Sequence, residues 1–298
     1  MAPLPSAAKD QAYIDVSVLR AGLLEIPREW AIDIALPGER LKSPTLSFLL
    51  HHSKTRDTFV FDLGVRRDWQ NATPAVVGIV KHMQFEIEVP QDVVESLAAG
   101  NLSPDDIKHV CISHLHLDHF GNPAYFTKSI FVVGEGCREL LSDHVYPKDP
   151  TSAIPSDPLP LDRTTFLDLS SSPPIGPFEH ALDFYGDGSL YIVDAGPAHI
   201  PGHINILART SPDGGWVYLA GDTAHDRQLL YGEGKIPRHS VFGCAHLDPE
   251  KAAEHIAKVR QLMEEESRVQ VILAHDKPWY DENTDRNVWF PSGKITSL

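Results

Sequence analysis

The sequence is poor in cysteine, in basic residues and in long apolar runs, and each shortage excludes a class of protein. Its three cysteines, Cys111, Cys137 and Cys244, are too few and too scattered for a disulfide framework or a cysteine-based zinc site. Only 26 Lys and Arg residues face 41 Asp and Glu residues, which gives a formal net charge of −15 at pH 7. Because an acidic surface repels polyanions, we do not expect nucleic acid as a partner.

The sequence also shows no segment that would cross a membrane. No apolar run approaches the roughly 20 residues that a membrane-spanning helix needs, so we expect no membrane association. Residues 1–6 lack the basic region and the apolar stretch of a signal peptide. With 42% hydrophobic and 22% charged residues, the composition is typical of an ordinary globular protein, and we expect a cytoplasmic location.

A run of metal-ligating side chains follows a strongly predicted strand. Residues 107–112 are apolar and β-branched, and His114, His116, Asp118 and His119 come next in the pattern H-x-H-x-D-H. Side chains two apart at a strand end lean to the same side, whereas the last two residues lie where the chain is already turning. This spacing indicates two adjacent metal ions. A chance gathering of histidines on a loop is the alternative, since the sequence has 16 of them.

The H-x-H-x-D-H motif after a strand resembles the signature of the metallo-β-lactamase superfamily. The resemblance covers about residues 44–276 and implies an α/β fold, a four-layer αββα sandwich. Two mixed β-sheets would pack face to face with helices outside. Asp62, followed by Leu63 and Gly64 at the end of a predicted strand, matches the buried residue that supports the metal loop in this family, with a role as a direct metal ligand as the alternative. Three further ligands are implied in order, a His, an Asp and a final His.

The chain has a candidate for each later ligand. Alignment on Pro201-Gly202 gives His199 the ligand position of lactonase-like members, while His203 is the competitor and is expected to begin the next strand. Asp222 ends the predicted strand 216–222 and matches the metal-bridging position. His275 lies at the end of the last expected strand, 269–276, and matches the position of the final His. Ligands at the ends of several buried strands form one consistent arrangement.

The resemblance implies a metal site built from imidazoles and carboxylates. Zn²⁺ suits such ligands best, with other divalent transition metals open, and we expect two Zn²⁺ per chain. The implied reaction is attack on a carbonyl by a metal-bridging hydroxide, because a metal lowers the pKa of bound water to about 7. One ion would be held by His114, His116 and His199, the other by Asp118, His119 and His275, with Asp222 bridging them.

Two residues are expected to act in catalysis. Asp118 can carry the proton as well as bind metal. His225 lies three residues after Asp222, where acyl-homoserine-lactone lactonases place a Tyr that touches the substrate carbonyl. An imidazole can donate a hydrogen bond or a proton there. A solvent-facing histidine is the alternative. Of the remaining histidines, only His246 could reach the pocket.

The expected activity is the opening of a small lactone or lactam ring, with a small cyclic ester or amide as substrate. A thioesterase of the glyoxalase II type is the nearest rival, although the chain after residue 276 lacks the basic character that glutathione would need. A non-catalytic metal-binding interaction protein is the alternative from a different class. Such proteins usually lose a ligand, whereas every implied ligand is present here.

The chain is expected to form a single metallo-β-lactamase-like domain, residues 1–298. It would have a loose tail at about 1–12 and a Pro-, Ser- and Asp-rich surface insertion at about 146–177.

A strand is expected in 12–24, mainly loop in 26–44, and a hairpin from 46–50 and 58–64. Residues 65–90 lack clean periodicity and could line a substrate cavity or pack in the core. Further expected elements are helices at 91–99 and 249–266, a strand at 130–133 and a hairpin across 182–193.

Overall fold

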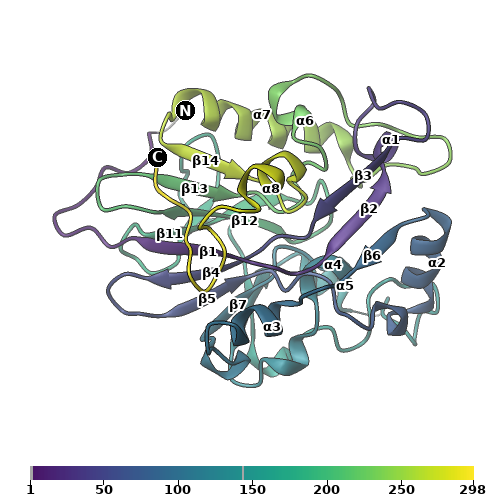
Figure 1. The fold of residues 1–298 in the computed structure, drawn as a ribbon, viewed down its shortest axis with the longest axis horizontal. Helices are drawn as coiled ribbons and strands as arrows, with labels where there is room; N and C mark the ends of the chain where they lie inside the picture. Colours follow the sequence, from purple (N-terminus) through teal and green to yellow (C-terminus); the bar gives the residue numbers. More distant parts are fainter. Residues whose placement is uncertain (1–2, 143) are drawn as a thin grey trace.

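The computed structural model describes residues 3–142 and 144–298. Two mixed β-sheets pack face to face, and helices cover their outer faces (Figure 1). Helix α7 (Pro249–Glu265) lies over one sheet and α3 (Val93–Ala98) over the other. The expected αββα sandwich is therefore confirmed.

Each large sheet combines antiparallel and parallel strands. The first has the order β1-β4-β5-β7-β8-β9, with β5, β7, β8 and β9 parallel. The second has the order β10-β11-β12-β13-β14, with only β13 and β14 parallel. The first comprises β1 (Ile14–Leu19), β4 (Ser47–His52), β5 (Thr58–Phe61), β7 (His109–Cys111), β8 (Ile130–Gly134) and β9 (Thr164–Leu167). The second comprises β10 (Ala181–Asp183), β11 (Leu190–Gly196), β12 (His203–Arg209), β13 (Trp216–Leu219) and β14 (Val269–Ile272).

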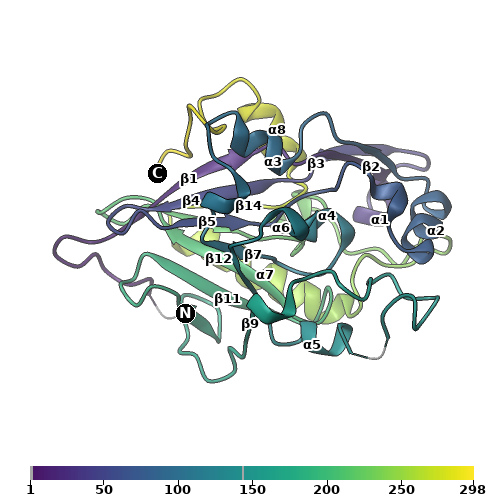
Figure 2. The same ribbon diagram turned by 90° about the horizontal axis from the view of Figure 1, so that it is seen from below.

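A small antiparallel sheet and short helices complete the structure. The small sheet has the order β3-β2-β6 and comprises β2 (Leu23–Pro27), β3 (Arg40–Pro44) and β6 (Glu86–Glu88). It lies with α1 and α2 at one end of the sandwich (Figure 2). The other helices are α1 (Arg28–Ala31), α2 (Pro74–His82), α4 (Leu117–Phe120), α5 (Cys137–Leu140), α6 (Gln228–Tyr231) and α8 (Lys277–Asn283). Single 3₁₀ turns span Trp69–Asn71, Pro104–Asp106, Pro123–Tyr125 and Leu161–Arg163.

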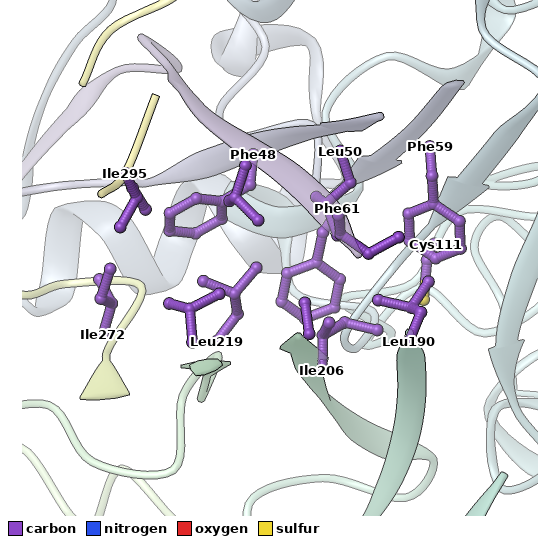
Figure 3. Packing of buried hydrophobic residues seen from close by; sticks show 14 of the residues in the cluster. Phe48, Leu50, Phe59, Phe61, Cys111, Leu190, Ile206, Leu219, Ile272 and Ile295 are labelled. Atoms are coloured by element: carbon purple, nitrogen blue, oxygen red, sulfur yellow. The ribbon is translucent and has the colours of Figure 1, made fainter. Parts of the chain in front are cut away.

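Period-two alternation along the strands divides the core into layers. In β4, Phe48 and Leu50 point between the two sheets, whereas Leu49 points outward to the layer that contains α3. In β12, Ile206 points between the sheets and Leu207 points toward α6 and α7. Figure 3 shows side chains of both sheets meeting in the central layer. Because both faces of these strands are buried, apolar residues occupy consecutive positions in the middle of β4 and in most of β12.

The two helices that were expected have clear end signals. In α3, Asp92 accepts a hydrogen bond from the backbone N–H of Glu95, and the Glu95 side chain accepts one from Asp92 in return. In α7, Asp248 caps the first turn and Pro249 occupies the first helical position. Both helices agree with the sequence prediction, as do the β4–β5 and β10–β11 hairpins.

The predictions for the N-terminal region need correction. The strand expected in 12–24 is present as β1, but the chain turns at Gly22 with φ of 112° and a second strand, β2, follows that was not expected. Residues 26–44 contain α1 and β3 instead of mainly loop. Residues 1–2 of the expected tail lie outside the described residues. Residues 3–12 form neither helix nor strand, but the side chain of Gln11 donates to the carbonyls of Ala12 and Asp187, both at 2.8 Å, so the tail is held against the sandwich.

The stretch 146–177 is not entirely a surface insertion. It contains β9, the edge strand of the first sheet, which is half-buried and therefore lacks a strong apolar pattern. Ile154, Leu159 and Leu169 from the same stretch are buried in the core. In the part of the chain that the structure describes, we find no helix long and apolar enough to span a bilayer.

Candidate metal centre

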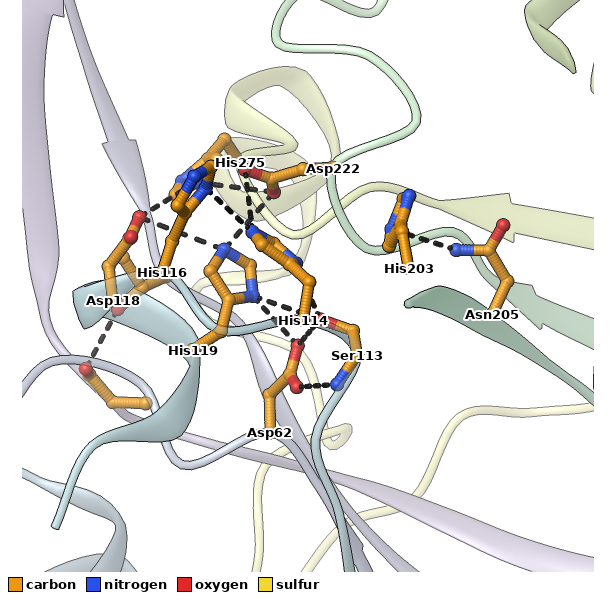
Figure 4. Close-up of polar contacts among 12 residues, drawn as sticks. Asp62, Ser113, His114, His116, Asp118, His119, His203, Asn205, Asp222 and His275 are labelled. Atoms are coloured by element: carbon orange, nitrogen blue, oxygen red, sulfur yellow. Dashed lines mark hydrogen bonds and ion pairs between the residues drawn. The ribbon is translucent and has the colours of Figure 1, made fainter. Parts of the chain in front are cut away.

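Strand ends from both large sheets deliver the candidate ligands to one place. His114 follows β7, and α4 then carries Asp118 and His119. Asp222 follows β13 and His275 follows β14, two parallel neighbours whose carboxyl ends meet at the same edge of their sheet. His199 comes from the β11–β12 loop. Figure 4 shows the labelled ligands from both sheets converging.

Three imidazoles form the first cluster. His114 Nε2 lies 2.9 Å from His116 Nδ1, and His199 Nε2 lies 3.2 Å and 3.1 Å from these two atoms. The ring planes are nearly perpendicular to one another, at 85–89°. Three ring nitrogens thus point at one common position.

A carboxylate and two imidazoles form the second cluster. Asp118 Oδ2 lies 3.2 Å from His275 Nε2 and 3.7 Å from His119 Nε2. Asp222 joins this cluster through Oδ1, which is 3.2 Å from His119 Nε2 and 3.5 Å from His275 Nε2. Its other oxygen, Oδ2, is 3.5 Å from His199 Nε2 in the first cluster. The carboxylate of Asp222 therefore lies between the two clusters, with one oxygen toward each.

The far sides of three ligand histidines are held by other groups. A carboxylate and a backbone carbonyl can only accept, so the Nδ1 of His119 and of His275 carries a proton, and Nε2 is the nitrogen directed at the clusters. Asp62 also accepts from the backbone N–H of Ser113 at 2.6 Å, which fits the supporting role expected for it. The three contacts are His114 Nδ1 with Ser113 Oγ (3.0 Å), His119 Nδ1 with Asp62 Oδ2 (2.8 Å) and His275 Nδ1 with the Pro44 carbonyl (2.9 Å).

Burial and charge act in opposite directions on the titratable groups. Removal from solvent lowers the pKa of His116 to about 4. Burial alone would also lower the pKa of His275, but the carboxylates of Asp222 and Asp118 raise it to about 10. Burial would raise the pKa of Asp118, but His119 and His275 lower it to about 2. These carboxylates thus require positive charge beside them, which a divalent cation supplies when it displaces the imidazole protons.

The donor atoms of both clusters fit transition metals. Ligands of one tetrahedral Zn²⁺ lie about 3.3 Å apart, given metal–nitrogen distances of about 2.0–2.1 Å. The nitrogen separations of 2.9–3.2 Å in the first cluster are close to that value. His119 Nε2 and Asp222 Oδ1 are buried without a hydrogen-bond partner among the described residues. Such atoms are rare unless another group satisfies them, and an ion between them would do so.

A cavity of about 600 Å³ opens onto the two clusters. His116, Asp118, Asp222 and His275 contribute to its floor. Part of the stretch 65–90 lines the cavity, which was one of its two expected roles. None of the described lining residues is Lys or Arg. The walls come mainly from α2 and the small sheet and include Leu24, Ile26, Trp30, Ile79, Met83 and Phe85.

The structure separates the other candidate histidines into two groups. His203 begins β12, as expected, and its ring packs 5.2 Å from that of His114, but its Nε2 is directed at the Asn205 amide instead of the cluster (Figure 4). His225 lines the cavity, is only 3% exposed and has its Nε2 3.1 Å from Asp222 Oδ2, so the solvent-facing alternative is wrong. His246 packs against the rings of His199 and His225, with centroids 5.0 Å and 5.1 Å away. Sequence spacing gave only a weak signal for His246, because it follows no strand and has no nearby ligand partner.

The chain is similar to curated proteins and to solved structures. A curated cytochrome P450 monooxygenase, mpaDE of Penicillium roqueforti, is 33% identical over 92% of this chain, and the chain spans 35% of that relative's length. The γ-lactamase MBL2 of Gibberella moniliformis is 37% identical over 56% of this chain and 70% of the relative. A crystal structure of B. thuringiensis AiiA with N-decanoyl-L-homoserine bound aligns with a TM-score of 0.70 over 95% of this chain and 99% of that chain, at 20% identity. That likeness shows a shared fold.

The match at the level of the family covers most of the sequence. A family model for the metallo-beta-lactamase superfamily matches residues 42–275, which include every candidate ligand. The resemblance carried by the H-x-H-x-D-H motif is thereby confirmed, and the chain belongs to the metallo-β-lactamase superfamily.

Proposed function

We propose that this protein is a dinuclear metal-dependent hydrolase that opens the ring of a small lactone or lactam. The observation that carries the proposal is the position of Asp222 at the floor of an apolar cavity. Its two oxygens each lie against a different imidazole cluster, at 3.5 Å from His199 Nε2 and 3.2 Å from His119 Nε2. A carboxylate in this position can hold two ions at a fixed separation beside a bound carbonyl.

Two Zn²⁺ are the ions we propose, because the donors are imidazole nitrogens and carboxylate oxygens. When bound, they would supply a Lewis acid and lower the pKa of water so that a nucleophile forms near neutral pH. The first cluster would hold one ion and the second cluster the other, and Asp222 would contribute to both. The buried partners of His114, His119 and His275 keep their ring nitrogens aimed at the ions.

Two side chains of the cavity floor are proposed to handle protons. Asp118 is a buried carboxylate 3.2 Å from His275, and it can accept the proton released when the nucleophile forms. His225 has its Nε2 at the cavity wall, directed at Asp222 Oδ2 in this structure. The same N–H can be offered to the carbonyl oxygen or the leaving group of a bound substrate. Both residues would act beside the reacting bond.

The walls of the cavity indicate which substrates fit. Apolar side chains from α2 and the small sheet can bind a hydrophobic group and exclude water from the reacting bond. Because no Lys or Arg is among the described lining residues, an anionic substrate such as a glutathione thioester has no cationic partner there. A relative, MBL2, is named a γ-lactamase, and a mutant of the structural neighbour AiiA was crystallised with N-decanoyl-L-homoserine, which carries a long apolar acyl chain.

A substrate panel tests this proposal. Zinc-loaded protein would be assayed with uncharged lactones, uncharged lactams and glutathione thioesters of similar size. We expect turnover of at least one uncharged ring and none of the thioesters. Turnover confined to the thioesters would favour the glyoxalase II alternative. Metal binding without any turnover on the panel would favour a non-catalytic role.

A further inference from the structure

His246 is an unusual buried residue in this structure. Both of its ring nitrogens are buried and lack a hydrogen-bond partner among the described residues. Its side chain is 4% exposed, and it is not among the residues that line the 600 Å³ cavity. An imidazole in such a place costs stability unless its donor and acceptor are satisfied, so an apolar side chain would be preferred if packing alone mattered.

Two more unpartnered nitrogens belong to its neighbours. They are the Nδ1 atoms of His199 and His225, whose rings lie 5.0 Å and 5.1 Å from the ring of His246. One ring nitrogen of each of the three histidines lies within 4.8 Å of the others. A direct hydrogen bond after a small ring rotation can close that span, and so can one bridging water.

The proton positions on the two neighbours follow from their other contacts. His199 presents Nε2 to the first cluster, so as a metal ligand it carries its proton on Nδ1 and is a donor there. His225 directs Nε2 at a carboxylate oxygen of Asp222, so it carries its proton on Nε2 and Nδ1 is an acceptor. A neutral imidazole has one donor and one acceptor. His246 therefore matches both neighbours, one nitrogen to each.

Three of the other four ligand histidines show what His199 would otherwise lack. His114, His119 and His275 each have a polar group against the ring nitrogen that faces away from the clusters. Metal-ligating histidines almost always have such a partner, and it fixes both the ring orientation and the tautomer. For His199 Nδ1, the described hydrogen bonds provide none, and the ring of His246, 5.0 Å away, carries two nitrogens that also lack a partner among the described residues.

We propose that His246 is a positioning residue that links His199 to His225. Its neutral imidazole accepts from His199 Nδ1–H and donates to His225 Nδ1, directly or through a water. The resulting chain of contacts runs from His199 through His246 and His225 to Asp222. It connects two metal ligands, His199 and Asp222, by a route that does not pass through the ions. The inference rests on the proposed metal centre, and it assigns His225 the tautomer that offers Nε2–H to Asp222 and to the substrate.

Three variants of the full chain test the link through metal affinity. We expect His246→Leu to weaken one of the two ions about 10–100-fold, the usual effect of losing such a partner. His246→Gln retains one donor and one acceptor and should recover most of that affinity. The matched control is His52→Leu, which removes another buried histidine, bonded to Asp187 at 2.8 Å, and should leave both affinities unchanged. Each affinity would be measured by chelator competition, with the visible absorption of Co²⁺-loaded protein reporting the geometry of the weakened site.

Several results would overturn the proposal. Wild-type affinities in His246→Leu would do so, as would equal losses in the Leu and Gln variants. A third ion, bound by the wild type and lost in His246→Leu, would show that the three histidines form a metal site of their own. A wild-type protein that binds no metal would remove the proposed function together with this inference, whereas two tightly bound ions unaffected by His246 would remove only the inference.

Nitrogen-15 NMR of the zinc-loaded wild type tests the same link without a variant. We expect His225 to be neutral with its proton on Nε2, and His199 to carry its proton on Nδ1. A signal from His225 in the opposite tautomer would contradict the assignment, even if His246→Leu failed to fold.

Discussion

At the scale of single residues, two histidines four positions apart compete for one ligand position. His199 lies in the first cluster, with its Nε2 3.2 Å and 3.1 Å from ring nitrogens of His114 and His116. His203 begins a strand, and its Nε2 lies 3.4 Å from the Asn205 amide instead. Strand geometry separates them, because the side chain of His203 belongs to the regular alternation of β12.

The two histidines should therefore differ sharply on substitution. We expect His199→Ala to lose the ion of the first cluster and with it hydrolytic activity. His203→Ala should keep both ions and lose only stability. Metal content per chain and turnover of the best lactone would be measured for both variants. The reverse pattern would mean that the alignment on Pro201-Gly202 is wrong by four residues.

His225 offers a second comparison at the residue scale. If its N–H assists the carbonyl oxygen or the leaving group, His225→Ala should lower kcat about 10²–10⁴-fold, the usual contribution of general acid–base help. His225→Gln retains an N–H donor and should lose less. Metal content measured beside the kinetics should stay at the wild-type level. Unchanged kcat and KM in His225→Ala would show a bystander, and a change in KM alone would show ground-state binding only.

At the scale of elements, the strand ends were the predictable part of the structure. Buried strands such as β7, β13 and β14 are mainly apolar, so a polar ligand after each one is conspicuous. The small sheet was missed because its three strands are short and only partly buried, and β2 and β3 end in proline. Edge strand β9 was missed for the same reason.

The residues of the candidate site were likewise predictable only where they follow a recognisable strand. Its ligands were predicted because they follow a family motif and end recognisable strands. His246 was not, because its neighbours His199 and His225 come from other parts of the chain and only the fold brings them together. The role of Trp30 in the cavity wall could not be predicted either, because it depends on how the small sheet lies against α2.

Asp62 allows a test of how one element supports another. It follows β5 with φ of 61° and accepts hydrogen bonds from Ser113, just beyond β7, and from His119 on α4. We expect Asp62→Asn and Asp62→Ala to weaken the ion of the second cluster about 10–100-fold. Asn tolerates this backbone conformation, so only the Ala variant should also carry backbone strain. Site-resolved metal titration and thermal unfolding would separate the two effects. Undiminished affinity for both ions would show that Asp62 supports only the backbone.

At the scale of the whole molecule, the two clusters join the two halves of the sandwich. The H-x-H-x-D-H residues extend from the first sheet, whereas His199, Asp222 and His275 extend from the second. Asp222 reaches donors from both halves, at 3.2 Å from His119 and 3.5 Å from His275. Ions bound here would hold together elements that are distant in sequence.

Metal removal should therefore destabilise the whole fold and not only the site. An ion that binds the native state alone adds about 2.7 kcal/mol at a free concentration 100 times its Kd. We expect a chelator to lower Tm by several degrees and metal replacement to restore it. Calorimetry at several metal concentrations would show this dependence. A Tm that is independent of metal would mean that the ions do not join the two halves.

The number of metal ions in active protein tests the dinuclear site most directly. Elemental analysis and lactone turnover would be measured on the same preparations of the wild type and of Asp222→Ala. We predict about two transition-metal ions per wild-type chain, activity that disappears with a chelator, and fewer ions and no activity in Asp222→Ala, since one carboxylate faces both clusters. Full activity in wild-type protein that holds one ion or none would contradict the proposed dinuclear centre.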